Sequence, residues 1–269
     1  MPTLPALEEH LAGLGRVVLG YSGGVDSTLL AVAARRALGP ERMLAVIGRS
    51  ASYPAAQRDA AVALANQFDV PLLELETREL NDPQYVANTP DRCYFCKTEL
   101  WNRLGEIANA RGFDVVIDGT NADDLGDHRP GLRAALEHAV HSPLAELGWR
   151  KSDVRAAARE LGLPVWDAPA SPCLSSRIRY GLAVTPARLS QVEAAEAHLR
   201  TLGIDGDLRV RHLGAAASIE VRAEHHARLR DSWDALEAFF VSLGFNTVEL
   251  DPRGYRRGSL LAIAGESIR

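Results

Sequence analysis

A short glycine-rich segment near the start of the chain, SGGVDS, has the composition of a phosphate-binding loop. Its two glycines allow a tight turn that directs backbone N–H groups toward an anion. Its serine hydroxyls can donate hydrogen bonds to phosphate oxygens, whereas its aspartate needs a bridging cation such as Mg²⁺. The segment matches neither GxGxxG nor GxxxxGKS/T, and the alternative is an ordinary turn. The candidate residues are Ser22, Gly23, Gly24, Asp26 and Ser27.

A second polar segment, DGTNADD at residues 118–124, combines carboxylates with an amide. It follows a predicted strand and resembles the acidic and amide cluster with which PP-loop ATPases contact the nucleotide and its metal, which implies the same contacts here. The alternative is a solvated acidic turn. We select Asp118, Asn121 and Asp124 here, with Asp26 and Asp124 as magnesium ligands, and add Ser50 for the adenine or ribose.

The chain has three cysteines, Cys93 and Cys96 in a CxxC motif and a distant Cys173. Structural zinc takes four ligands, and the fourth would have to be a histidine. Three thiolates suit a [4Fe–4S] cluster with one iron that the protein does not ligate. Cys173 alone is a candidate nucleophile, and buried, inert thiols are a further alternative. The candidate fourth ligands are His128, His138 and His141.

Alternating elements position these residues. Apolar, β-branched runs end in turns and are followed by segments of helical periodicity, which predicts a doubly wound, mostly parallel α/β sheet. Ligands bind such sheets beyond the carboxyl ends of the strands. The glycine-rich loop, Ser50 and the 118–124 turn all follow predicted strands, so we expect them at one edge. The predicted strands are 15–24, 42–48, 70–76 and 113–121, and the predicted helices are 25–38, 53–68 with Pro54 in its first turn, 97–112 and 151–162.

The pattern changes after about residue 180, which predicts a smaller α+β domain. We place the domains at 1–178 and 179–269, with a proline-rich hinge region at 165–177. His225 and His226 fall at a predicted helix start and are interpreted as surface residues. The expected elements are a helix at 185–203 capped by Thr185 with Pro186 next, a hairpin at 207–214 and 217–222, a helix at 224–243 and a strand at 247–250.

Composition and net charge limit the classes of protein and of partner that fit this sequence. The chain has 269 residues, 46% hydrophobic and 24% charged, with a formal net charge of −5. This is ordinary for a globular protein, and the negative charge argues against a nucleic-acid partner. We see no secretory leader and no apolar run of membrane-spanning length, so we expect a cytoplasmic protein without membrane contact.

Several stretches together resemble one family. The glycine-rich loop resembles that of the PP-loop ATPases, which cleave ATP between the α and β phosphates. With RCYFCKTELW, IDGTNADDLGDHRPGLRAA, SPLAELGWRKSDVR, PASPCLSSRIRYG and GYRRGSL, the chain looks like the LarE family of ATP-dependent sulfur transferases in nickel-pincer nucleotide biosynthesis. The resemblance implies adenylation of the carboxylates of pyridinium-3,5-biscarboxylic acid mononucleotide and their conversion to thiocarboxylates. It also implies a homohexamer.

The resemblance also assigns roles to residues. In one variant of the family, a lone cysteine at the position of Cys173 gives up its sulfur and becomes dehydroalanine. In the other, three cysteines bind a [4Fe–4S] cluster that relays sulfide, and this chain resembles that type. Arginine suits the phosphate of the substrate because its planar group donates two parallel hydrogen bonds. The candidates for binding the substrate are Ser176, Arg177, Arg209 and Arg211, although a solvated strand face would also explain the last two.

Weaker candidates and other functions remain. Glu196 and Trp101 suit a helix-surface salt bridge and a packing aromatic better than an active region. Other PP-loop enzymes, such as the NAD and GMP synthetases that use ammonia or the tRNA thiolases, share the ATP chemistry. The former need no such cysteines, and the latter need more positive charge. A zinc-stabilised nucleotide-binding module without catalysis is a third alternative.

Overall fold

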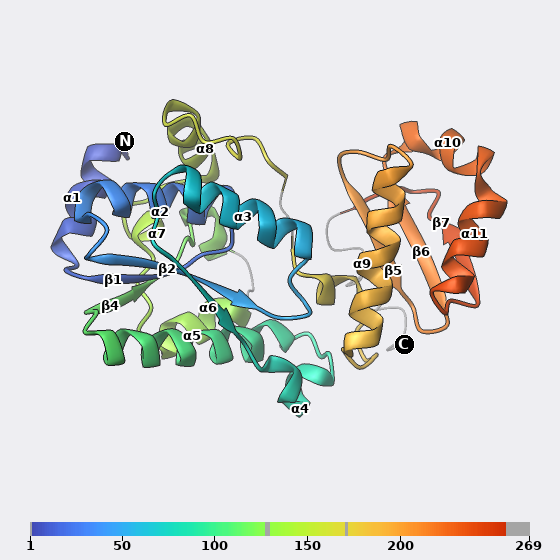
Figure 1. The fold of residues 1–269 in the computed structure, drawn as a ribbon, viewed down its shortest axis with the longest axis horizontal. Helices are drawn as coiled ribbons and strands as arrows, with labels where there is room; N and C mark the ends of the chain where they lie inside the picture. Colours follow the sequence, from blue (N-terminus) through green and yellow to red (C-terminus); the bar gives the residue numbers. More distant parts are fainter. Residues whose placement is uncertain (1, 127–129, 170–171, 257–269) are drawn as a thin grey trace. The chain divides into compact units, whose positions relative to one another are not determined.

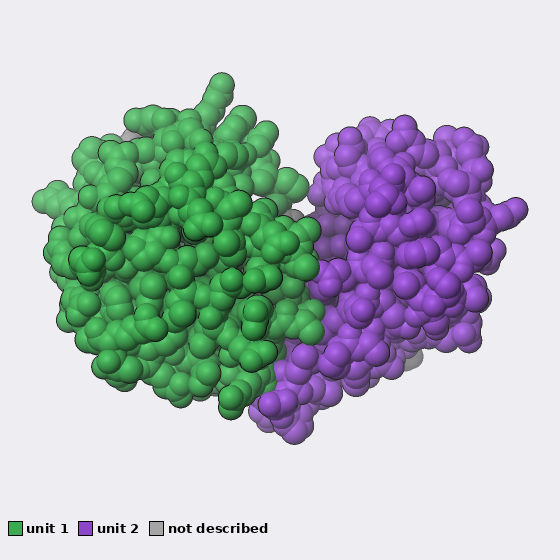
Figure 2. Space-filling model, in the orientation of Figure 1, with its two compact units in different colours: residues 1–79, 91–171 green, residues 80–90, 172–269 purple. Residues whose placement is uncertain are grey.

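A computed structural model describes residues 2–126, 130–169 and 172–256. These residues form two compact units, which Figure 2 colours separately. Unit 1 is drawn from residues 1–79 and 91–171, and unit 2 from residues 80–90 and 172–269. The predicted division after residue 178 therefore falls within unit 2. None of the described helices combines the length and apolar character needed to cross a lipid bilayer.

Unit 1 is built on a parallel four-stranded sheet with the order β3–β2–β1–β4. Its central strand β1 contributes three side chains without exposed surface, Val17, Val18 and Leu19, so the sheet is covered on both faces. Such continuous apolar strands are typical of parallel sheets between helical layers. This confirms the predicted α/β fold. The strands are β1 (Val17–Gly20), β2 (Met43–Arg49), β3 (Leu72–Glu76) and β4 (Val115–Ile117).

Helices pack on both faces of this sheet (Figure 1). Helices α1, α2 and α8 bury apolar residues against one face, and α5 and α6 cover the other. The predicted helix 25–38 matches α2 residue for residue. The helices of unit 1 are α1 (Leu4–Gly13), α2 (Val25–Leu38), α3 (Ala55–Gln67), α5 (Arg92–Arg111), α6 (Pro130–Glu137), α7 (Pro143–Glu146) and α8 (Lys151–Glu160), with the 3-10 turn η2 (Ala122–Gly126). A second 3-10 turn, η1 (Glu79–Asn81), starts at the last residue of this segment of unit 1 and continues into unit 2.

Two helix starts differ from the prediction. Helix α5 begins at Arg92 rather than at residue 97, so Cys93 and Cys96 lie in its first turns on one face, three positions apart. Pro54 is the N-cap of α3 instead of a residue of its first turn. Proline has a fixed φ and no N–H to donate, so it fits either position.

Unit 2 contains a three-stranded sheet with the order β5–β6–β7, in which β5 and β6 form the predicted antiparallel hairpin and β7 joins parallel to β6. Thr185 caps α9 by accepting from the Arg188 N–H at 3.3 Å. The predicted helix 224–243 is interrupted at Ser232. The elements are α4 (Pro83–Val86), η3 (Leu174–Arg177), α9 (Pro186–Thr201), β5 (Leu208–His212), β6 (Ala216–Val221), η4 (Ala223–His225), α10 (His226–Asp231), α11 (Trp233–Ser242) and β7 (Thr247–Leu250).

The segment 80–90 belongs to unit 2 although it lies far from the rest of that unit in sequence. Asn88 is fully buried, and its Nδ2 donates to the carbonyls of Ile178, Arg179 and Leu182 at 2.9–3.2 Å. The Tyr85 hydroxyl lies 2.6 Å from the Ser175 hydroxyl. These side-chain bonds hold the segment beside the residues that follow Cys173.

Candidate functional site

The glycine-rich loop joins β1 to α2, and its own side chains close it. Ser27 Oγ accepts from the Ser22 N–H at 3.2 Å and donates to the Gly24 carbonyl at 3.1 Å. It also lies 3.1 Å from Ser22 Oγ. Because Ser27 is only 5% exposed, it supports the loop from inside, and its predicted direct contact with phosphate stays a prediction.

Gly23 is required by the local geometry. Its φ is +68°, and a Cβ there would lie 2.4 Å from the Ala61 Cβ, so any side chain would clash. Tyr53 holds the same stretch from the side of α3, because its hydroxyl donates to the Ser22 carbonyl at 2.9 Å. Burial, and then the neighbouring Tyr21, raise the pKa of Tyr53, which keeps its hydroxyl protonated as a donor.

Asp26, in the first turn of α2, meets two other segments. Nδ2 of Asn121 lies 3.2 Å from Asp26 Oδ1 and 2.9 Å from Asp124 Oδ2, so one amide bridges both carboxylates. Lys151, the first residue of α8, forms an ion pair with Asp26. Its backbone N–H donates to Asp123 Oδ2 at 2.8 Å. The structure thus brings the two predicted motifs together and adds a cation that the sequence reasoning missed.

The turn after β4 packs directly on the start of α2. A Cβ at Gly119 would lie 2.9 Å from the Ser27 backbone nitrogen, so glycine permits this approach. Lys151 joins the site because α8 starts beside η2, where the Ala122 N–H donates to the Trp149 carbonyl at 2.7 Å. A lysine at a predicted helix start was the only sequence signal for this position.

Asp118 has a different position from the other predicted acids. Its carboxylate accepts from the Thr120 N–H at 3.0 Å, from the Thr120 hydroxyl at 2.9 Å and from the Ser142 hydroxyl at 2.8 Å. The residue is 8% exposed. Three donors satisfy much of its capacity, which supports a structural role for Asp118 in this turn rather than contact with a nucleotide.

Ser50 follows β2 directly and therefore lies at the same edge of the sheet as the glycine-rich loop after β1. Its carbonyl accepts from the Tyr53 N–H at 3.1 Å, so the Ser50 turn and the loop share Tyr53 as a connection. Its hydroxyl lies 2.8 Å from that of Ser52. This position fits the predicted nucleoside contact.

The three cysteines, all of them within the described residues, form no disulfide, and they are divided between the two units. Cys93 is exposed and Cys96 half-buried on α5 of unit 1, and Cys173 is half-buried immediately before η3 of unit 2. Their convergence on one cluster stays a prediction. Among the alternative zinc ligands, His138 and His141 belong to unit 1, and His128 lies outside the described residues.

In unit 2, the Arg177 side chain lies against the backbone of Cys173 and forms a hydrogen bond with it. Its guanidinium makes a two-bond ion pair with Glu196, at 3.0 and 3.1 Å, and donates to the Cys173 carbonyl at 3.0 Å. The Ser176 hydroxyl donates to the same carbonyl at 2.7 Å. The side chain of Arg177 is 3% exposed, so the predicted Glu196 salt bridge exists but is buried instead of lying on the helix surface.

Arg209 and Arg211 project from β5 beside this pair, and each is 6% exposed, which rules out the solvated strand face. Arg211 bonds Glu220 Oε2 at 2.7 Å and the Ser176 carbonyl at 3.0 Å. Burial, and then the charge of Arg177, lower the pKa of Arg209. We call these three arginines the arginine cluster; two of them, Arg177 and Arg211, pair with the carboxylates of Glu196 and Glu220.

His212 ends β5 next to this cluster. Its Nε2 lies 2.9 Å from the Gln191 amide oxygen, and its Nδ1 accepts from the Gly214 N–H at 3.2 Å. These partners require a neutral ring with the proton on Nε2. Burial, and then the charge of Arg188, lower the pKa of His212 to about 4, in agreement with that arrangement.

Trp101 is a packing residue, as its sequence context predicted. It is 2% exposed, and a Cβ at Gly20 would lie 2.8 Å from its ring. The Lys97 amine lies 4.7 Å from the centre of the Trp101 ring. The tryptophan thus fills the space under β1, where glycine leaves room for it.

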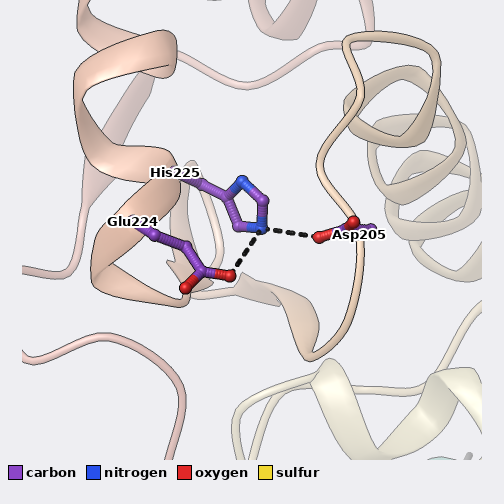
Figure 3. Close-up of side chains that lie close together, drawn as sticks. All are labelled: Asp205, Glu224 and His225. Atoms are coloured by element: carbon purple, nitrogen blue, oxygen red, sulfur yellow. Dashed lines mark ion pairs between the residues drawn. The ribbon is translucent and has the colours of Figure 1, made fainter.

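Among the described residues, one group of three side chains has ligand atoms close enough for a metal ion: Asp205, Glu224 and His225 (Figure 3). His225 Nε2 lies 3.0 Å from Asp205 and 3.8 Å from Glu224. Both carboxylates are mostly exposed, so an ion pair explains the arrangement, and it contains no cysteine. The prediction that His225 and His226 are surface residues was wrong, since each is only 9% exposed.

Comparison with known proteins places this geometry in a family. The profile of the NAD synthase family matches residues 7–91, which carry the glycine-rich loop. The chain is 26% identical to one component of the glutamine-hydrolysing GMP synthase of Thermococcus kodakarensis, over 73% of this chain and 75% of that protein. An uncharacterised protein of Synechocystis is 42% identical over 96% of both chains.

One relative carries a defined activity in its name. The pyridinium-3,5-bisthiocarboxylic acid mononucleotide synthase of Lactiplantibacillus plantarum is 38% identical over 93% of this chain and 90% of its own length. Identity at this level over nearly the whole of both chains exceeds what a shared ATP-binding domain alone would give. The chain belongs to the family of this synthase, the LarE family.

Proposed function

We propose that the protein is an ATP-dependent sulfur transferase that converts the carboxylates of pyridinium-3,5-biscarboxylic acid mononucleotide into thiocarboxylates. The observation that carries the proposal is the junction of Asp26, Asn121, Asp124 and Lys151 at the end of the glycine-rich loop. The 38% identical synthase supports the choice of substrate. Two rounds of the reaction give the bisthiocarboxylic acid.

ATP activation follows from the chemistry of a carboxylate. An oxygen of the substrate carboxylate attacks the α-phosphorus, the bond to the β-phosphate oxygen breaks, and pyrophosphate leaves. The acyl carbon then carries AMP, which is a far better leaving group than oxide. Lys151 and the loop N–H groups stabilise the negative charge that builds up on pyrophosphate. Asp26 would exchange its pairing with Lys151 for a phosphate-bound cation.

The carboxylates at this edge fit a magnesium ion. Asp26 and Asp124 are both within hydrogen-bond distance of one amide group, which shows that their oxygens lie close together. Mg²⁺ takes one or two carboxylates plus phosphate oxygens and water. When bound there, it would neutralise charge on the departing pyrophosphate.

Sulfur transfer has two routes that the cysteines allow. In the sacrificial route, the Cys173 thiolate attacks the acyl carbon and AMP leaves, giving a thioester. Loss of the Cys173 α-proton then breaks its Cβ–S bond, which leaves a thiocarboxylate and dehydroalanine. In the other route, Cys93, Cys96 and Cys173 would hold a [4Fe–4S] cluster, which when bound would supply sulfide for the attack on the acyl carbon, with AMP leaving. The three-thiol donor set fits such a cluster, and we favour this route.

The arginine cluster supports binding of the substrate phosphate. Arg177 and Arg211 donate to the backbone carbonyls of Cys173 and Ser176, and the buried Arg209 is close enough for the charge of Arg177 to lower its pKa. Three guanidinium groups gathered in this way favour an anion. Arginine donates to two phosphate oxygens at once. A phosphate held there would keep the pyridinium carboxylate near the Cys173 segment. The hexamer predicted from the family can be tested by light scattering.

The decisive experiment uses protein purified and reconstituted without air. It is incubated with ATP, Mg²⁺, sulfide and the pyridinium dicarboxylate mononucleotide, and AMP and the product mass are measured. AMP together with a mass increase for oxygen-to-sulfur exchange supports the proposal. If ammonia replaces sulfide and an amide forms instead, the GMP synthase relatives indicate the correct chemistry. Absence of AMP in all arms excludes both enzymes and favours a binding module.

A further inference from the structure

The turn after β2 and the turn after β3 are joined by a buried chain of polar side chains that the proposed chemistry does not use. Ser50 Oγ lies 2.8 Å from Ser52 Oγ, and Ser52 Oγ donates to Glu79 Oε1 at 3.3 Å. Glu79 is 2% exposed and Ser52 5% exposed. Ser50 is half-buried, so it is the end of the chain that a ligand can reach.

Glu79 is an unusual residue to bury. Its Oε1 accepts from one serine, and its Oε2 has no hydrogen-bond partner among the described residues. A buried carboxylate with so few donors is unfavourable, since each unsatisfied polar atom loses its hydration without replacement. Apolar packing would be more stable at this position, which indicates a functional reason for the carboxylate.

The number of hydroxyl protons fixes which group donates in each hydrogen bond between Ser50, Ser52 and Glu79. Ser52 Oγ donates to Glu79 Oε1, so the single hydroxyl proton of Ser52 is used in that bond. The Ser50–Ser52 bond must then use the Ser50 proton. Ser50 Oγ also accepts from the Ser52 N–H at 3.1 Å. One lone pair of Ser50 Oγ is left, so Ser50 offers a ligand an acceptor and no donor.

We infer that Glu79 is a positioning residue that orients the Ser52 and Ser50 hydroxyls so that Ser50 accepts a hydrogen bond from the nucleoside of ATP. The triphosphate has no donor at neutral pH, so phosphate cannot satisfy Ser50. Adenosine has three donors: the 2′-hydroxyl, the 3′-hydroxyl and the 6-amino group. The Tyr53 connection to the Ser22 carbonyl places this turn beside the glycine-rich loop. The inference rests on the proposed ATP site.

The test measures binding of four nucleotides to the full-length protein by calorimetry with Mg²⁺. They are ATP, 2′-deoxyATP, 3′-deoxyATP and the triphosphate of purine riboside, each analogue lacking one donor. We expect one analogue to bind about 3- to 10-fold more weakly than ATP, as the loss of one neutral hydrogen bond predicts. In Ser50→Ala this difference should disappear, because ATP falls to the affinity of that analogue.

Two further variants test the direction of the hydrogen bonds that run from Ser50 through Ser52 to Glu79. In Glu79→Met and in Ser52→Ala, the Ser50 hydroxyl is free to donate its own proton to the ligand. The ratio of the affinities for ATP and for the analogue that lacks the donor should therefore shrink to about 2-fold or less, while ATP still binds. Melting curves identify a variant that fails to fold, and the second variant then decides. A merely structural role would lower stability and leave the ratio of affinities unchanged.

The outcomes separate the two levels of inference. Equal binding of all four nucleotides by the wild-type protein, or an unchanged ratio in Ser50→Ala, overturns the role of Ser50. An unchanged ratio in both Glu79→Met and Ser52→Ala overturns the role of Glu79. If the wild-type protein binds no ATP, the proposed ATP site itself is wrong and this inference fails with it.

Discussion

Replacing Lys151 by methionine tests the nucleotide end of the site. Methionine reproduces the apolar stem of lysine as far as Cε and removes the charged amine at the start of α8. In the structure this charge pairs with Asp26, whose own predicted partner is magnesium. If Lys151 moves to the departing pyrophosphate during the reaction, its loss should slow AMP formation and leave folding nearly intact.

The magnitude follows from the exposure of the pair. The side chains of Lys151 and Asp26 are 40% and 21% exposed, so without ligand the ion pair contributes only about 0–1 kcal/mol to stability. A hydrogen bond to a charged group contributes about 1.5–3 kcal/mol. For a partly exposed lysine we take about 2 kcal/mol in the transition state, which is roughly a 30-fold loss in kcat/KM.

The assay follows AMP and pyrophosphate under single-turnover conditions, with thermal unfolding measured in parallel. Lys151→Arg is the matched control, because it keeps the charge, and we expect it to retain activity within about 5-fold. The reasoning is refuted if Lys151→Met forms AMP at the wild-type rate. It is equally refuted if the melting temperature and the activity fall together in both variants, since the lysine would then be structural.

Three more outcomes follow from the geometry. Gly23→Ala should abolish ATP binding in calorimetry, since its Cβ would lie 2.4 Å from Ala61 and its φ is +68°; retained affinity would show that the loop rearranges freely. Cys93→Ser should remove bound iron from air-free preparations and stop multiple turnover, whereas dehydroalanine at Cys173 in the wild-type protein would instead indicate the sacrificial route. His212 has a folded-state pKa of about 4, below its unfolded value of 6.5, so the unfolded chain binds more protons between these values. The free energy of unfolding in urea should therefore fall as pH falls from about 6.5 toward 4, and a conservative replacement of His212 by glutamine should flatten that dependence.

The sequence predicted the parts of the site that a strand-end rule can reach. Asp26 and Asn121 lie 95 residues apart, yet they meet because both follow parallel strands whose carboxyl ends share one edge. The shared face of Arg209 and Arg211 on β5 was predicted for a similar reason, because alternate residues of a strand point to one side, while their role in binding stays a prediction. In both cases local periodicity and one topological rule carried the inference.

Other parts depend on contacts that local patterns do not encode. Lys151 is one charged residue at a helix start, and only the packing of α8 on η2 gives it a role. Glu79 looks like an ordinary acidic residue after a strand, but its burial makes it informative. The segment containing Asn88 joins unit 2 through side-chain hydrogen bonds to carbonyls that are far away in sequence. No periodic pattern in the sequence predicts such bonds.

Both regions proposed to bind anions keep their charges in internal pairs, and this has a consequence for binding. Asp26 holds Lys151 in one unit, and Glu196 and Glu220 hold two arginines in the other. Buried cations without counter-ions would destabilise the empty protein, so the pairs make the ligand-free fold tolerable. A phosphate must then compete with a carboxylate that is already in place. In the proposed site, Asp26 would be freed from that competition when it turned to a bound Mg²⁺, and Lys151 would then be available to pyrophosphate. The partly exposed pair can separate at little cost, whereas the buried arginine pairs cannot. We therefore expect an exchange of partners at the proposed nucleotide site and a fixed arrangement in the arginine cluster.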